Sequence, residues 1–162
     1  MSRLNLRLML PLAGALLLGA CSTVQGPPSV PTASKTGQSW VVTRPLVAAQ
    51  VLDTCSRPSP GRDAGRVLGY WAPSRADVDR MEAQLAQLQP QLEAPQLFDR
   101  QYVGIETQAG RRIYVNAFRL PDGATIDPAR EAIRVCDGGR QFWGAVYDPQ
   151  RGRFDELQFN GG

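Results

Sequence analysis

Apolar side chains recur at every third or fourth position between Ser74 and Gln89, as they do along one face of an α-helix. Ser74 can cap the first turn, and Asp77, three residues later, approximates a capping box. Pro90 restricts the residue before it and should end or kink the helix. The segment is predicted to be an amphipathic helix that packs on a sheet, with a partner-binding or membrane-binding face as the alternative. Its apolar stripe consists of Val78, Met81, Leu85 and Leu88.

After this helix the apolar period changes to two, which is typical of β-strands. Turn-forming sequences interrupt the alternation at Gln108-Ala109-Gly110, at Asp137-Gly138-Gly139 and at residues 148–152, and Asp127-Pro128 is typical of a short helical turn. Strands joined by tight turns form an antiparallel meander. The predicted fold class is α+β, a single domain with one main amphipathic helix packed on an antiparallel meander of about five strands. These strands are residues 101–107, 111–120, 131–136, 141–147 and 153–159.

The segment before the helix gives a weaker pattern. Residues 40–53 alternate imperfectly, and Pro45 argues against a central strand, so an edge strand or a short helix is expected there. Residues 56–69 contain several prolines and glycines and are predicted to form a loop.

Alternation along the strands separates an aliphatic set of side chains from an aromatic set. We expect the helix to cover the aliphatic set. The aromatic set is then either a surface for a protein partner or a second small core beneath the segment between Trp40 and Trp71. The aliphatic set is Val103, Ile105, Ile113, Val115, Ala117 and Val146. The aromatic set, and thus the candidate partner surface, is Tyr102, Tyr114, Phe118, Trp143 and Tyr147.

The composition argues against several kinds of chemistry. The chain has no histidine, which is the commonest general base and metal ligand, and its one lysine, Lys35, lies in a predicted linker. Asp148, Asp155 and Glu156 surround a turn and are expected to be solvated, which disfavours acid–base catalysis and metal binding. Phosphate-loop, dinucleotide and serine-hydrolase motifs are missing from the sequence. We therefore expect neither an enzyme nor a protein with a metal or other cofactor.

The N-terminus has the organisation of an export signal. Arg3 and Arg7 precede an apolar run of 11 residues, 8–18, which is too short to cross a bilayer as a helix. The sequence Leu18-Gly19-Ala20-Cys21 follows, and it resembles the lipobox of bacterial lipoprotein precursors, in which Gly19 is a less common choice at its position. An ordinary secretory signal cut near Ala20 is the alternative.

The lipoprotein resemblance implies a domain organisation and a location. Residues 1–20 would be removed as a signal peptide, and Cys21 would carry acyl chains such as palmitate. Residues 21–39 would form the lipidated N-terminus and a disordered tether, and residues 40–162 a periplasmic domain. Ser22 implies the periplasmic face of the outer membrane, with the outer leaflet of the inner membrane as the alternative. Loss of two arginines lowers the net charge from +3 to about +1, which disfavours nucleic acid as a partner.

Two cysteines remain in the expected domain, Cys55 and Cys136. The periplasm is oxidising, so they are predicted to form a disulfide. A redox-active dithiol is the alternative, but such pairs usually lie close together in sequence.

The globular part resembles a group of uncharacterised exported bacterial proteins over roughly residues 55–161. Quoted from the chain, the segments that carry this resemblance are Tyr102-Val103-Gly104-Ile105, Arg111-Arg112-Ile113-Tyr114-Val115-Asn116, Cys136-Asp137-Gly138-Gly139, Phe142-Trp143-Gly144 and Phe159-Asn160-Gly161. The resemblance implies no known activity.

The function expected from these observations is that of a membrane-anchored, non-catalytic binding or accessory protein of the cell envelope, with another envelope protein as partner. The first alternative is an inhibitor of a cell-wall hydrolase such as lysozyme, acting through the 56–69 loop or the 137–140 turn. A hydrolase that uses carboxylates is the second alternative.

The disulfide can be tested by replacing both Cys55 and Cys136 with serine. The bond would close a loop of about 80 residues, so its loss is expected to lower the free energy of unfolding by roughly 4 kcal/mol. Denaturant unfolding of the wild type with and without reductant provides the control, because reductant should leave the double variant unchanged. Alkylation of either thiol in the unreduced wild-type protein would show that the bond does not form.

Overall fold

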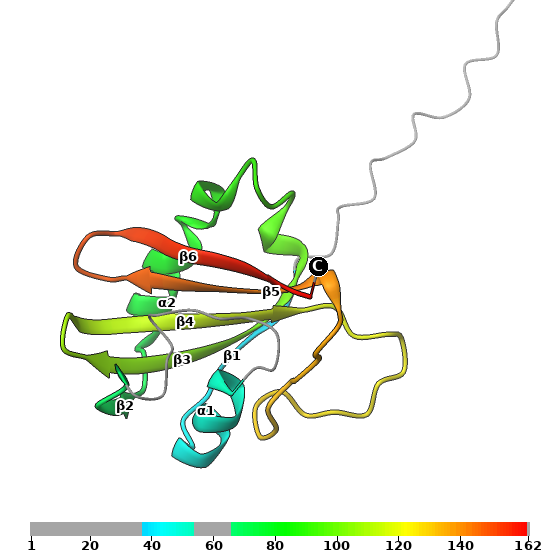
Figure 1. The fold of residues 1–162 in the computed structure, drawn as a ribbon, viewed down its shortest axis with the longest axis horizontal. Coiled ribbons are helices and arrows are strands. Elements are labelled where there is room, and N and C mark those ends of the chain that lie inside the picture. Colours follow the sequence, from blue (N-terminus) through cyan, green and yellow to red (C-terminus); the bar gives the residue numbers. More distant parts are fainter. Residues whose placement is uncertain (1–36, 54–65, 162) are drawn as a thin grey trace, which may run out of the picture. The chain divides into compact units, whose positions relative to one another are not determined.

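The computed structural model describes residues 37–53 and 66–161, which form a six-stranded, mostly antiparallel sheet with two α-helices in one mixed α/β domain (Figure 1). Four long strands are consecutive antiparallel neighbours: β3 (Asp99–Thr107), β4 (Gly110–Phe118), β5 (Gly139–Asp148) and β6 (Arg153–Asn160). Two short strands share the outer edge of β3. β1 (Ser39–Val41) is parallel to β3 and pairs with the first half of it. β2 (Gly69–Trp71) is antiparallel to β3 and pairs with the second half.

Two of the predicted turns are confirmed. Gln108 and Ala109 connect β3 to β4, and Gly110 adopts a φ of 100°, which is costly for residues with a Cβ atom. At the β5–β6 turn, the Asp148 carboxylate accepts backbone N–H bonds from Gln150 and Arg151 at 2.9 and 3.1 Å. Both turns fix the register of the strands that they join.

The predicted amphipathic helix begins as expected and changes character halfway. Ser74 caps α2 (Arg75–Glu82) in a capping box with Asp77, whose pKa is lowered mainly by the hydrogen bonds it accepts from Ser74. After Glu82 the chain continues as the 3₁₀-helix η3 (Leu85–Leu88) instead of an α-helix. The apolar stripe nevertheless stays buried through both helices.

The side chain of Gln87, on η3, bonds to the turn before β6 and to β6 itself, which is an edge strand of the sheet. Its amide donates to the Gly152 carbonyl at 3.0 Å and accepts from the Phe154 N–H at 3.1 Å. Further along β6 the pairing with β5 shifts at a bulge, where Glu156 has a φ of 58°.

The segment expected to be an edge strand or a short helix contains both. β1 lies at the edge of the sheet, and α1 (Pro45–Leu52) follows it with Pro45 in the first turn, where a missing N–H has no cost. A second 3₁₀-helix, η4 (Pro95–Leu97), precedes β3. In the part of the chain that the structure describes, no helix is long and apolar enough to cross a membrane.

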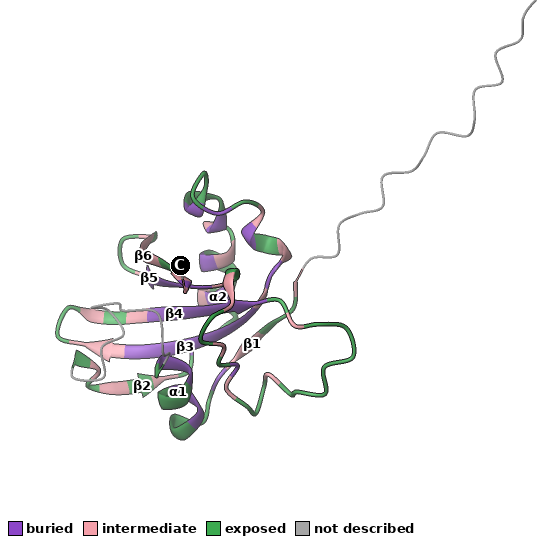
Figure 2. Cartoon of the chain, turned by 45° about the vertical axis from the view of Figure 1, so that its right-hand side comes forward, coloured by how far each residue is buried: buried purple, intermediate pink, exposed green. Residues whose placement is uncertain are grey.

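Each face of the sheet has its own helical cover and core. One core joins α2 and η3 to Tyr102, Trp143 and the alternate β4 residues that begin at Ile113. The other joins α1 to Val103, Ile105, Tyr114 and Val146. Figure 2 shows burial concentrated along the middle of the sheet.

The predicted division into an aliphatic and an aromatic face is therefore wrong. In β4, Ile113, Val115 and Ala117 share a face with Tyr102, because strand pairing places Val115 opposite Tyr102. All five aromatic residues proposed as a partner surface are 0–3% exposed, so they are core residues and cannot meet a partner in this conformation. The alternative of a second core beneath residues 40–71 holds for two of them: α1 covers Tyr114, and Trp40 stacks on Phe118 with ring centroids 6.3 Å apart. The other three belong to the core beneath α2 and η3. The five are Tyr102, Tyr114, Phe118, Trp143 and Tyr147.

Residues 131–136 do not form the predicted strand, and Asp137-Gly138-Gly139 is not the turn of a hairpin. β4 pairs directly with β5, and residues 119–138 form a long connection between them. Ile133 bonds to the side-chain amides of Gln101 and Asn116 instead of to a neighbouring strand. A segment with strand-like apolar alternation can thus bond its backbone to side chains instead of to a neighbouring strand. The period of two alone does not distinguish these two cases.

Gly104 provides a test of the packing between β2 and β3. A Cβ atom there would lie 2.2 Å from the Trp71 carbonyl oxygen and 2.9 Å from its indole ring. We expect Gly104→Ala to lower the free energy of unfolding by about 1–3 kcal/mol through overpacking. Gly69→Ala in the paired strand is the matched control, because its Cβ would make only an ordinary 3.5 Å contact. Equal denaturation midpoints for the two variants would contradict the packing.

Candidate functional site

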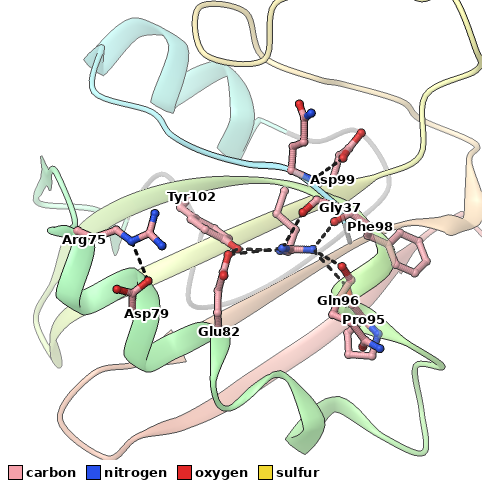
Figure 3. A network of polar contacts seen from close by, with 11 residues as sticks. Gly37, Arg75, Asp79, Glu82, Pro95, Gln96, Phe98, Asp99 and Tyr102 are labelled. Carbon is pink, nitrogen blue, oxygen red and sulfur yellow. Dashed lines mark hydrogen bonds and ion pairs between the residues drawn. The ribbon is translucent and has the colours of Figure 1, made fainter. Parts of the chain in front are cut away.

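The most extensive buried polar network of the described residues surrounds Arg100, on β3 (Figure 3). Its side chain is 2% exposed, and its Nε donates to the Tyr102 hydroxyl at 2.7 Å. The two terminal nitrogens reach the Glu82 carboxylate, at 3.4 Å, and four backbone carbonyls. These carbonyls belong to Gly37, Pro95, Gln96 and Phe98. One guanidinium thus connects the sheet, the end of α2, the η4 segment and the first described residue of the chain.

Tyr102 links this buried charge to the surface. Its hydroxyl donates to Glu82 Oε1 at 2.5 Å, and the Glu82 side chain is 31% exposed. Burial raises the pKa of Tyr102 far above its usual value, and the Arg100 charge opposes this only in part. The tyrosine therefore stays protonated and serves as a hydrogen-bond donor at neutral pH.

Backbone hydrogen bonds near the start of the described chain bring the acceptors of Arg100 together. Gly37 donates its N–H to the Gln96 carbonyl at 2.9 Å, and a Cβ at Gly37 would lie 1.9 Å from the Phe98 oxygen, so only glycine fits. Gln38 bonds to the Asp99 carboxylate at 2.7 Å and to the Arg100 N–H at 2.9 Å. The folded unit consequently begins by Gly37, three residues before the predicted start at Trp40.

A second buried ion pair joins Arg112 and Asp148 at 3.1 Å, with side chains 12% and 2% exposed. The expectation that Asp148 is solvated is therefore wrong. Its carboxylate is buried because it satisfies the turn N–H groups of residues 150 and 151 as well as the Arg112 charge. This is a structural arrangement at the end of a hairpin.

A third polar group lies on the α1 face of the sheet, where Gln101 and Asn116 are 0% and 1% exposed. Asn116 Nδ2 donates to Gln101 Oε1 at 3.1 Å and to the Ile133 carbonyl at 2.9 Å. Gln101 Nε2 donates to the carbonyls of Pro128 and Glu131, both at 2.6 Å. Both amides thus hold the connection between β4 and β5 against the sheet.

Among the other predicted site residues, Cys136 lies just before β5. Its predicted partner Cys55 and the predicted lipidation site Cys21 are outside the described residues. The described ranges contain no group of three or more Cys, Asp or Glu side chains that could hold a metal ion.

Sequence reasoning missed Arg100, Gln101 and Asn116, although the signal was present. A period of two places Arg100 on the same strand face as Tyr102, and Gln101 on the face of Val103. Polar residues at inward positions of an otherwise apolar strand call for buried partners. The partners themselves come from distant segments, so the spacing could not identify them.

Compared with protein-family models, with curated proteins and with solved structures, the chain shows no match. Its buried ionisable groups hold backbone segments in place, which is the chemistry of a rigid scaffold.

The role of Tyr102 is testable through the pH dependence of stability. Its pKa is higher in the folded state than the unfolded value near 10, so its contribution is complete below pH 10 and is lost as the pH rises further. Tyr102→Phe should lower the free energy of unfolding at pH 7 by about 1.5–3 kcal/mol, because a bond to a carboxylate is lost. It should also reduce the decline above pH 10 by up to about 1.4 kcal/mol per pH unit.

Denaturant titrations between pH 7 and pH 11 measure both effects of this substitution. Tyr70→Phe, at an exposed position on β2, is the control and should change the stability at pH 7 by less than about 0.5 kcal/mol. An unchanged alkaline slope in Tyr102→Phe would show that the folded protein does not hold this proton.

Proposed function

We propose that this protein is a lipid-anchored accessory protein of the cell envelope, which binds another envelope protein and is not an enzyme. The observation that supports the binding role best is the use of its buried polar side chains. Arg100, Asp148, Gln101 and Asn116 all bond to backbone atoms of loops, turns or chain ends. Such groups fix the positions of surface segments, as a binding scaffold requires.

The anchor rests on the lipobox sequence that ends at Cys21. Each buried CH₂ of an acyl chain contributes about 0.8 kcal/mol, so two or more chains hold a protein stably at a membrane. Ser22 favours the outer membrane, with the domain in the periplasm and the proposed Cys55–Cys136 disulfide formed there.

The start of the domain suits a tethered protein. Gly37 and Gln38 are bonded on both sides by the η4 segment and by β3. A tether that ended there would join the domain at one fixed point instead of at a fraying strand.

The anchor is tested by Cys21→Ser. Wild-type cells grown with labelled palmitate should yield a labelled protein in the outer-membrane fraction. The variant should lose the label and become extractable without detergent, because no acyl chain holds it. Ser22→Asp is the matched control for location: it should keep the label and move the protein to the inner membrane. A water-soluble wild-type protein with a free Cys21 thiol would overturn the anchor.

A further inference from the structure

The connection between β4 and β5 has an exposed part, residues 121–127, each of which is exposed to solvent. In Figure 1 it is the wide loop that leaves the end of β4, and in Figure 2 most of it is coloured as exposed. Long loops without strands or helices of their own are uncommon in small domains and are usually functional or disordered. This loop has hydrogen bonds that give it a defined form.

The base of the loop is held by the two buried amides. Gln101 and Asn116 occupy inward positions of central strands, where apolar residues would pack without the cost of desolvating an amide. Their bonds reach the loop backbone at residues 128, 131 and 133. Ile133 is buried as well, which adds an apolar contact to the base. The most buried polar side chains of β3 and β4 therefore hold this one loop in place through hydrogen bonds.

Two turns frame the exposed tip. Ala124 N–H bonds to the Pro121 carbonyl at 3.2 Å, with Gly123 at a φ of 82° as a turn of this kind requires. Asp127 then begins a second turn, because its side chain accepts the Ala129 N–H and its carbonyl accepts the N–H groups of Arg130 and Glu131. Ile126 lies between the turns and is 43% exposed, one of few large apolar side chains in the described residues to be so.

Between residues 121 and 131 the loop carries the charged side chains Asp122, Asp127, Arg130 and Glu131. Asp127 is balanced by Arg130, at 3.6 Å, but Asp122 and Glu131 form no ion pair within the described ranges. Arg119, at the start of the connection, lies over the ring of Phe98 at 4.4 Å and thus points back to the domain. The exposed part of the loop accordingly presents one branched aliphatic side chain, with Asp122 before it in sequence and the paired Asp127 directly after it.

We propose that residues 121–131 are the docking element of the domain, and that Ile126 enters an apolar pocket rimmed by basic groups on a second, different envelope protein. This proposal rests on the proposed binding function and adds the surface and the chemistry of the partner. Complementary charge would guide the encounter, while the buried isoleucine would supply affinity. The rigid base reduces the entropy lost when the loop binds.

The test is photo-crosslinking of the full-length, anchored protein in its own cells. A benzophenone amino acid replaces Thr125, next to Ile126, and in a parallel strain it replaces Leu46, which is 82% exposed on α1. Position 125 should give one defined adduct with another protein, identified by mass spectrometry. Ile126→Asp should reduce the yield of that adduct at least about tenfold, because burial of a branched aliphatic side chain contributes a factor of about ten or more in affinity. Ile126→Val keeps a branched aliphatic side chain and should keep the adduct.

A pair of charge reversals tests the basic rim. Asp122→Arg should reduce the adduct several-fold, and Glu93→Arg, at an exposed position outside the loop, should not. Far-UV circular dichroism and the melting temperature of each variant exclude unfolding as the cause.

The outcomes separate this proposal from the binding function on which it rests. An adduct from position 46 with none from position 125 would overturn the docking element and leave the binding function standing. An adduct of the chain with itself, or one that is insensitive to Ile126→Asp and Asp122→Arg, would also overturn it. No adduct from either position would overturn the docking element as well, while the binding function does not depend on these two positions.

Discussion

The guanidinium of Arg100 makes the interaction on which the start of this domain and the η4 segment depend. A buried positive charge is tolerated only where hydrogen bonds and an opposite charge replace water, and here four backbone carbonyls, a hydroxyl and a carboxylate do so. Those carbonyls come from segments with little regular structure, which would otherwise leave acceptors unsatisfied. The same contacts therefore neutralise the charge and order the chain before β1 and β3.

Local patterns predicted the parts of the fold that local forces determine. The Ser74 cap, the start of α2 and the turns at Gly110 and Gly152 follow from a few neighbouring residues, and the structure confirms them. The face of each strand depends instead on register between strands, which pairs Tyr114 with Val103 regardless of whether either side chain is aromatic. The predicted aliphatic and aromatic sets consequently each contain residues from both cores. The change from α2 to η3 was not predicted either, and the Gln87 side chain on η3 bonds to Gly152, 65 residues further along the chain.

The candidate site shows the same limit more strongly. An inward arginine two residues before an inward tyrosine is visible in the sequence, but its carbonyl partners are not, because any residue type can supply a backbone oxygen. Likewise, the segment 131–136 has a strand-like alternation, and only the amides of Gln101 and Asn116 explain why it lies against the sheet without joining it. Hydrogen bonds to backbone carbonyls and side-chain amides thus determine where these segments lie, and the pattern of residue types does not predict such bonds.

The edge strand β6 has a consequence for how copies of this domain meet one another. An open sheet edge would let neighbouring copies stack strand on strand into assemblies. Here the Gln87 amide takes up a donor and an acceptor at one end of β6, and the kink at Glu156 twists the remainder out of line. Collisions between copies of the domain therefore meet no regular template for strand pairing along this edge.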